Sequence, residues 1–190
     1  MKGCRPLTDA EIQGCLAVLS KGSHPERDTA LFHLGLRTGF RISEILSLTV
    51  GDVYQNVQIV DEVYVARRNM KKKREGRRIK LHEEARSAIS ALVSSLEVFY
   101  PASPLFQSQK GGALNRKSAW LMLRKAYAAA GLNGKLGTHS MRKTFAKRIY
   151  EKLGKDLLKT QKALDHASVT STAAYLSFNQ DDIDDAILKS

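Results

Sequence analysis

Apolar residues recur at helical spacing along most of this chain. Ile12, Cys15 and Leu19 lie about one turn apart, so they share one face of a helix. Thr8 and Glu11 have the spacing of a capping box, and we expect this helix to begin after Thr8. The same periodicity, interrupted by glycines and prolines, predicts further helices over residues 27–38, 44–48, 82–99, 116–130, 139–153, 155–164 and 169–176.

Strand patterns occur only in the middle of the chain. Residues 57–60 and 63–66 are short apolar runs, and residues 79–81 can return beside them as a third strand. Residues 67–80 hold nine lysines and arginines against Glu75 alone, with Gly76 marking a turn. The pattern predicts a mainly α fold with a small antiparallel β-sheet, of the α+β class, whose hairpin tip is cationic.

The domain organisation follows from what lies between the elements. The sequence has no internal repeat, low-complexity stretch or long linker, so we expect one domain over residues 1–180. Residues 181–190 form an acidic tail with an apolar stripe, which predicts a short helix. This tail can dock on a neighbouring subunit or pack on its own domain.

Charge narrows the class of partner. The 190 residues include 31 lysines and arginines against 19 acidic residues, a formal net charge of +12. Such an excess favours nucleic acid first and an anionic membrane surface second. No apolar run is long enough for a membrane span, and we expect no signal peptide in the first residues. Cys4 and Cys15 lack histidines at metal spacing, which predicts a reduced, cytoplasmic chain without a zinc finger.

Several residues can bind or transform a phosphate, although each is a weak signal alone. His139 and Arg142 are three positions apart, so they share a helix face and can reach one anion near its N-terminus. Arg41 can grip a phosphate through two parallel hydrogen bonds, or pair with Glu44.

Taken together, the order and spacing of these residues resemble the tyrosine recombinase (phage integrase) family. That family has a T-G-x-R-x-x-E-[LI] segment, a hairpin lysine, an H-x-x-R helix, and an [LI]-G-H segment with a tyrosine nine residues after its histidine. The matching positions are Thr38-Gly39-Phe40-Arg41-Ile42-Ser43-Glu44-Ile45, Lys72, His139-Ser140-Met141-Arg142, and Leu164-Asp165-His166 with Tyr175. The resemblance covers about residues 7–178, including a Ser/Thr-rich stretch at 168–172.

The resemblance implies a site-specific recombinase or integrase that cuts and rejoins DNA through a 3′-phosphotyrosine intermediate. It implies that Arg41 and Arg142 clamp the phosphate with a hydrogen bond from His166, and that Tyr175 attacks it. His139 then accepts a proton, and Lys72 protonates the departing 5′ oxygen. The chemistry needs no cofactor and no metal, and the sequence has neither a glycine-rich phosphate loop nor a carboxylate cluster for two metals.

The expected partner is double-stranded DNA. Phosphate contacts are expected from Lys71, Lys73, Arg74, Arg77 and Arg78, and less strongly from Arg116, Lys117, Arg124 and Lys125. We expect Trp120 in the core, because Leu121 and Leu123 flank it. The family further implies a homo-oligomer, a tetramer on DNA, with a monomer possible in solution.

Two departures from the family pattern leave alternatives open. Asp165 stands at the family's glycine, and its carboxylate can raise the pKa of the His166 imidazole. A one-residue slip in the hairpin would turn Lys72 to the other sheet face, with Lys71 or Lys73 in its place. A DNA-binding module that has lost catalysis and a type IB topoisomerase are the competing interpretations. Because few residues precede the first helix, the chain is either a fragment or a compact recombinase like the small fimbrial-switch invertases.

Overall fold

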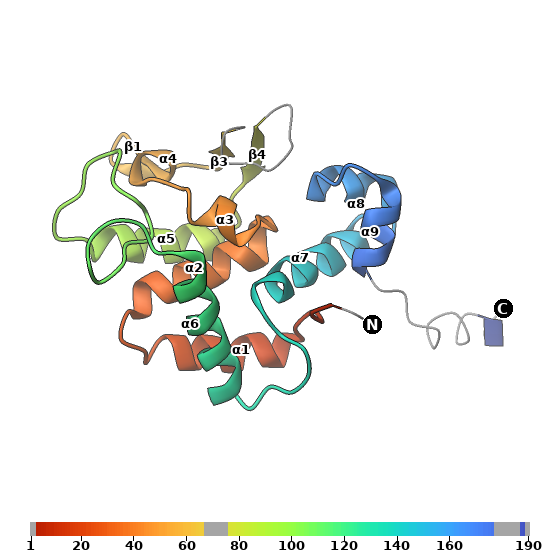
Figure 1. Cartoon of the computed structure of the whole chain (residues 1–190). Coiled ribbons are helices and arrows are strands. Elements are labelled where there is room, and N and C mark those ends of the chain that lie inside the picture. Colours follow the sequence, from red (N-terminus) through yellow and green to blue (C-terminus); the bar gives the residue numbers. More distant parts are fainter. Residues whose placement is uncertain (1–2, 67–75, 177–186, 189–190) are drawn as a thin grey trace. The chain divides into compact units, whose positions relative to one another are not determined.

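Residues 3–66, 76–176 and 187–188 are described by the computed structural model of this chain (Figure 1). The chain divides into two units, residues 1–145 and 146–190. The sequence pattern predicted no boundary at this point, which falls inside a helix. Most of the tail at 181–190 lies outside the described residues.

The first unit is built mainly from helices. They are α1 (Asp9–Leu19), α2 (Pro25–Thr38), α3 (Ile42–Ile45), α4 (Val50–Val53), α5 (Glu83–Ser94), α6 (Arg116–Ala129) and the start of α7 (Thr138–Lys152). The predicted capping box is confirmed, since Thr8 Oγ1 accepts from the Glu11 amide and Glu11 accepts from the Thr8 amide. The predicted 82–99 helix is shorter than expected and ends at Ser94.

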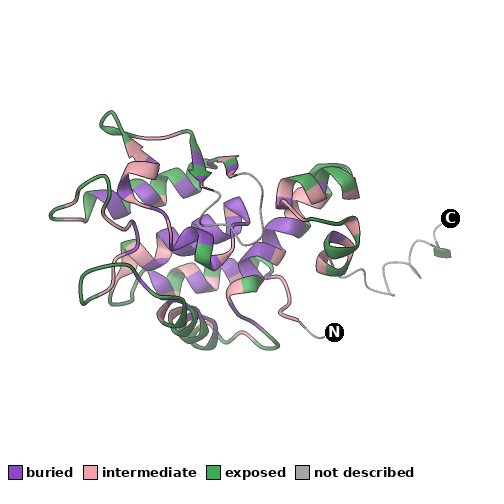
Figure 2. Ribbon diagram, turned by 45° about the horizontal axis from the view of Figure 1, so that its top comes forward, coloured by how far each residue is buried: buried purple, intermediate pink, exposed green. Residues whose placement is uncertain are grey.

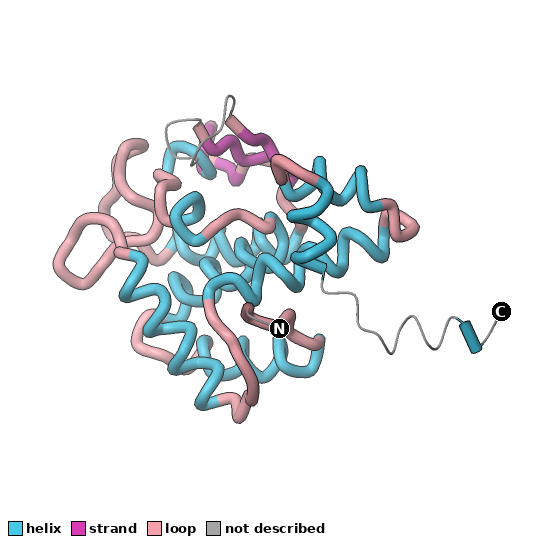
Figure 3. Tube along the Cα trace, turned by 45° about the vertical axis from the view of Figure 1, so that its right-hand side comes forward, coloured by secondary structure: helices cyan, strands magenta, loops and turns pink. Residues whose placement is uncertain are grey.

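Among the described residues, the strands form two separate two-stranded sheets, so the prediction of one three-stranded sheet is wrong. β1 (Tyr54–Gln55) pairs with β2 (Gln58–Ile59), and β3 (Glu62–Val65) pairs antiparallel with β4 (Arg77–Lys80). Figure 3 shows how small the strands are beside the helices. The pattern missed β1 because a two-residue strand has no measurable alternation. It also began β4 two residues late, and this places Arg77 inside the strand.

The core of the first unit is centred on α2, which packs against α5. Ala30, Leu31 and Leu34 of α2 are fully buried, and Ile89 of α5 lies in the same cluster. Figure 2 shows buried residues gathered where the helices of this unit face one another. A buried α2 gives the segment that leaves its C-terminus a rigid base.

The second unit contains the end of α7, α8 (Leu157–Leu164) and α9 (Val169–Leu176). Asp156 begins α8 by accepting a hydrogen bond from the Lys159 amide at 2.9 Å. Asp165 ends α8 in the left-handed conformation, with φ of 52°. Of the helices that the structure describes, none combines the length and apolar character required to cross a bilayer.

Candidate active site

Arg41 is held at the point where the chain leaves α2. Gly39 ends α2 in the left-handed conformation, and Arg41 is the N-cap of α3. The carboxylate of Glu44, itself buried, accepts from the Arg41 amide at 2.8 Å and from Arg41 Nη1 at 2.7 Å. The predicted pair with Glu44 is therefore present. About a third of the Arg41 side chain (31%) is exposed, so the guanidinium keeps a face toward solvent.

Arg142 reaches the same segment from α7. Its Nη1 donates to the carbonyl of Gly39, 103 positions away in the chain, and the side chain is buried. A side chain on Gly39 would overlap the Phe145 ring, one turn further along α7. Glycine at position 39 thus serves both the left-handed turn and the close approach of α7.

His139 lies in the first turn of α7, next to these arginines. Its pKa is lowered from the ordinary value, first because its ring is partly packed against protein and then because four cations are near. Those cations are Arg142, Arg41, Arg116 and Lys143. A histidine that stays neutral near pH 7 suits the expected role of proton acceptor.

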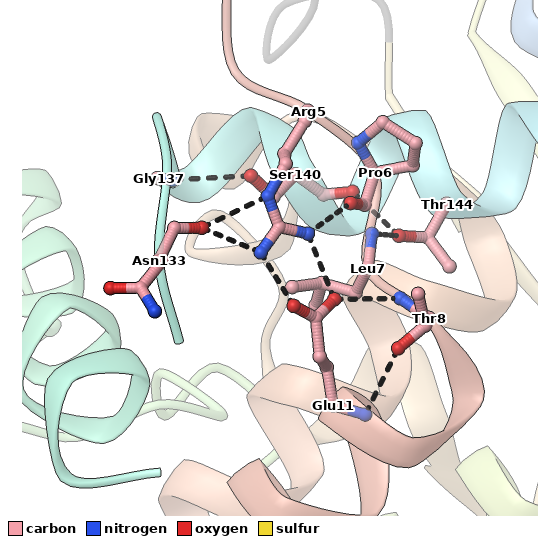
Figure 4. A network of polar contacts seen from close by, with 9 residues as sticks. All are labelled: Arg5, Pro6, Leu7, Thr8, Glu11, Asn133, Gly137, Ser140 and Thr144. Atoms are coloured by element: carbon pink, nitrogen blue, oxygen red, sulfur yellow. Dashed lines mark hydrogen bonds and ion pairs between the residues drawn. The ribbon is translucent and has the colours of Figure 1, made fainter. Parts of the chain in front are cut away.

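An N-terminal strap, Arg5–Thr8, secures the loop that precedes α7 (Figure 4). The Arg5 guanidinium donates to both carboxylate oxygens of Glu11, at 2.8 and 2.5 Å, and to the Asn133 carbonyl. The Leu7 amide donates to Thr144 Oγ1 of α7 at 2.8 Å. The hydrogen bond from Arg5 lowers the pKa of Glu11 to about 2. The sequence pattern did not single out Arg5, because its partner at residue 133 is remote in the chain.

His166 and Tyr175 lie together in the second unit. Their ring centroids are 5.2 Å apart in an edge-to-face arrangement, with 78° between the ring planes. The Gln161 side-chain amide donates to the His166 carbonyl at 3.0 Å. The spacing of nine residues therefore brings the expected phosphate donor beside the expected nucleophile.

Thr172 is a site residue that sequence reasoning missed. It is fully buried, and its Oγ1 lies 3.0 Å from Nδ1 of His166. This contact engages Nδ1 and holds the imidazole ring against α9. The Ser/Thr-rich stretch at 168–172 was a usable signal, but only the turns of α9 show which of its hydroxyls faces the histidine.

The left-handed backbone explains what the family's glycine contributes at position 165. Glycine adopts this conformation without strain, and aspartate is among the residues that tolerate it best. Asp165 therefore keeps the turn that carries the chain from α8 to His166.

The hairpin lysines and most of the expected DNA contacts there, Lys71, Lys72, Lys73 and Arg74, lie outside the described residues. Arg78 is 69% exposed, pairs with Glu62 at 3.0 Å and lies over the Tyr64 ring. Arg77 is placed differently. The expected phosphate contact assumed an exposed side chain, and this one is buried.

The position predicted for Trp120 is wrong. Ala119, Leu123 and Ala126 form the buried stripe of α6, while Trp120 is 41% exposed with Arg124 over its ring. The flanking leucines were misleading, because Leu121 is itself exposed and only Leu123 belongs to the buried stripe. The cations of this face, Arg116, Lys117, Arg124 and Lys125, are exposed.

Comparison with known proteins identifies the family of this chain. Residues 5–181 match the family described as "Phage integrase family". Tyrosine recombinase XerD of Corynebacterium glutamicum is 33% identical over 160 residues, which cover 83% of this chain and 50% of that protein. "Probable integrase/recombinase YoeC" of Bacillus subtilis is 33% identical over 157 residues, covering 82% of this chain and 80% of that protein.

Solved structures share the fold. XerA recombinase superimposes with a TM-score of 0.78 at 22% identity, covering all of this chain (100%) and 64% of that one. XerH bound to its difH substrate superimposes with a TM-score of 0.72 at 24% identity. The match covers 98% of this chain and 55% of XerH. A lambda integrase dimer bound to a COC′ core site superimposes with a TM-score of 0.68 at 19% identity. The match covers 92% of this chain and 48% of the lambda integrase chain.

The fold and the site thus define a tyrosine recombinase catalytic domain. The chain belongs to the phage integrase family. It spans half the length of its XerD relative (50%) and most of its YoeC relative (80%).

Proposed function

We propose that this chain cuts and rejoins double-stranded DNA as the catalytic part of a site-specific recombinase. Tyr175 Oη attacks the scissile phosphorus, the bond from phosphorus to the 5′ oxygen breaks, and a 3′-phosphotyrosyl ester forms. A 5′-hydroxyl from a second strand then attacks this ester and releases Tyr175. The phosphotyrosyl ester retains the energy of the broken phosphodiester bond. Rejoining the strands therefore requires neither a nucleotide cofactor nor a metal.

Charge is the main obstacle to this step. The scissile phosphate is anionic and the attacking phenolate is too, so catalysis depends on cations at the non-bridging oxygens. We assign this role to Arg41 and Arg142. His166 donates a further hydrogen bond to the phosphate. The step requires these groups of the first and second units to act on one phosphate.

Protons move at two positions. The phenol of Tyr175 has an ordinary pKa of about 10, so it needs a proton acceptor near pH 7, and His139 is assigned that role. Lys72 protonates the departing 5′ oxygen. The lowered pKa of His139 supports the first assignment, since a neutral imidazole can accept a proton.

The partner is DNA, and the assembly on DNA is a homotetramer in which the tail at 181–190 reaches a neighbouring subunit. The exposed Arg78 and the cations of α6 hold backbone phosphates, together with Lys71, Lys73 and Arg74. We place the activity in a bacterial cytoplasm, in association with the nucleoid, because the relatives named above are bacterial.

One observation carries the proposal. Arg41 belongs to the segment Thr38–Arg41, Arg142 is hydrogen-bonded to this segment, and the charges of both arginines lower the pKa of His139 in α7.

The test traps the covalent intermediate. The binding site is first mapped on the replicon that encodes the chain, and a short duplex carrying it is nicked near the cleavage position so that the released strand is lost. We expect a DNA adduct stable to denaturation in the unchanged chain and in Tyr100→Phe, which removes an exposed phenol hydroxyl. Tyr175→Phe should abolish the adduct and leave DNA retention nearly intact.

Other outcomes identify the alternatives. An adduct that persists in Tyr175→Phe would reassign the nucleophile to Tyr150, because Tyr127 is buried and its pKa is raised by that burial. DNA retention without any adduct would support a binding module that has lost catalysis. Relaxation of supercoiled DNA without strand exchange would support a type IB topoisomerase.

A further inference from the structure

Arg77 is a buried cation at the start of β4. Alternation along the strand places Arg77 inward, opposite the buried Val65, and places its neighbour Arg78 outward. Burying a guanidinium is costly unless its donors are used. The position of those donors therefore shows what Arg77 does in the fold.

Arg77 is bound to the segment Thr38–Arg41. Its Nη2 donates to the Thr38 carbonyl at 3.0 Å, and its Cζ lies 5.1 Å from the centroid of the Phe40 ring. Thr38 is the last residue of α2, where backbone carbonyls lack helical partners and a cation is favourable. A single side chain thus holds both the carbonyl before Gly39 and the ring after it.

Arg142 holds the next carbonyl, that of Gly39. Two consecutive carbonyls are therefore bound by two arginines, one from β4 and one from α7. Arg41 follows the buried residues 38–40 and is the N-cap of α3. Any shift at Thr38 or Phe40 displaces Arg41 and the acceptor that orients Arg142.

We propose that Arg77 is a positioning residue that fixes Arg41 and Arg142 for transition-state charge stabilisation, and that it does not contact DNA. This inference rests on the proposed function. Lysine has one ammonium and cannot at once reach the carbonyl and stack a planar guanidinium on Phe40, so the arginine is specific to the role.

The experiment compares Arg77→Met with Arg27→Met. Arg27 is also largely buried and also donates to a backbone carbonyl, that of Gln107 at 3.1 Å, but it lies at the other end of α2. Both variants should lose thermal stability. Only Arg77→Met should slow single-turnover adduct formation on the nicked duplex, by about 10²-fold, the effect of a small misplacement of catalytic groups. The Kd for DNA and its salt dependence should not change.

A second substrate separates positioning from general loosening of the fold. In a duplex with a methylphosphonate at the scissile position, one charged oxygen is replaced by methyl, so the clamp has less charge to stabilise. The loss in Arg77→Met should shrink to a few-fold on this substrate. Arg77→Lys should recover part of the rate on the ordinary phosphate, since it can still donate to Thr38.

Three results would overturn the inference: an unchanged adduct rate in Arg77→Met, an equal loss on both substrates, or a weaker Kd with a lower salt slope. The last result would make Arg77 a phosphate contact. If Arg77→Met does not fold, the same comparison is made with Arg77→Lys and Phe40→Leu, and equal losses on both substrates contradict the inference there too. A wild-type chain that forms no adduct would instead refute the proposed function.

Discussion

Thr172 Oγ1 lies 3.0 Å from Nδ1 of His166, within the same unit that carries Tyr175. We expect the hydroxyl to donate to Nδ1, because this leaves the proton on Nε2, the form that can donate to a phosphate oxygen. We therefore expect Thr172 to orient His166 for its proposed role.

Thr172→Val keeps the shape of this side chain and removes the hydroxyl. We expect adduct formation to slow by about 10-fold, the value of one lost hydrogen bond. Nitrogen chemical shifts of the His166 ring should show mixed tautomers in the variant. Ser171→Ala, which removes an exposed hydroxyl bonded to Ser168, is the control. Equal rates in both variants would contradict this role for Thr172.

The pH dependence of cleavage should report His139. The proton acceptor must be neutral, and its pKa in the folded chain is lowered, so activity should persist below the ordinary histidine value of about 6.5. Lys143→Gln removes one of the cations that lower this pKa, and should move the acid limb of the rate profile to higher pH. If the acid limb does not move in Lys143→Gln, a group other than His139 determines it.

The strap at Arg5 should contribute to stability in a pH-dependent way. The pKa of Glu11 falls from about 4.5 to about 2 on folding, so the pair stabilises the fold above pH 4.5 and loses its effect as the pH falls toward 2. Because the pair is partly exposed, we expect Arg5→Met to lower the free energy of unfolding by about 1 kcal/mol at pH 7. Urea titrations at pH 7 and at the lowest pH where the chain stays folded should show this difference shrinking. A constant difference would assign the effect to the Asn133 contact alone.

Arg78 should bind DNA through charge alone. Arg78→Gln should weaken binding to all sequences alike and reduce the slope of log K against log salt concentration by about 1. Titrations of specific and unrelated duplexes at several salt concentrations measure both effects. Loss of affinity for only the specific duplex would mean that Arg78 reads bases.

The helices and the ordered motifs could be predicted from sequence because both depend on local spacing. The capping box at Thr8 and the helix over residues 169–176 illustrate this. Arg77 could not be placed, since its burial depends on a strand register that begins two residues earlier than the apolar pattern indicates. The hydrogen bonds from Arg5 to the Asn133 carbonyl join segments that are remote in sequence. The role of Thr172 depends on the direction of one hydroxyl. Trp120 was misplaced because its immediate neighbours, rather than the turns of α6, were used to judge its environment.

The central claim is that Tyr175 and the two arginines act on the same phosphate. The most direct measurement is mass spectrometry of the peptide that remains linked to the nicked duplex after proteolysis. We expect a phosphotyrosyl link at Tyr175 in the unchanged chain, and none in an Arg41→Ala variant that still binds the duplex. A link at another residue, or an undiminished link in Arg41→Ala, would contradict it.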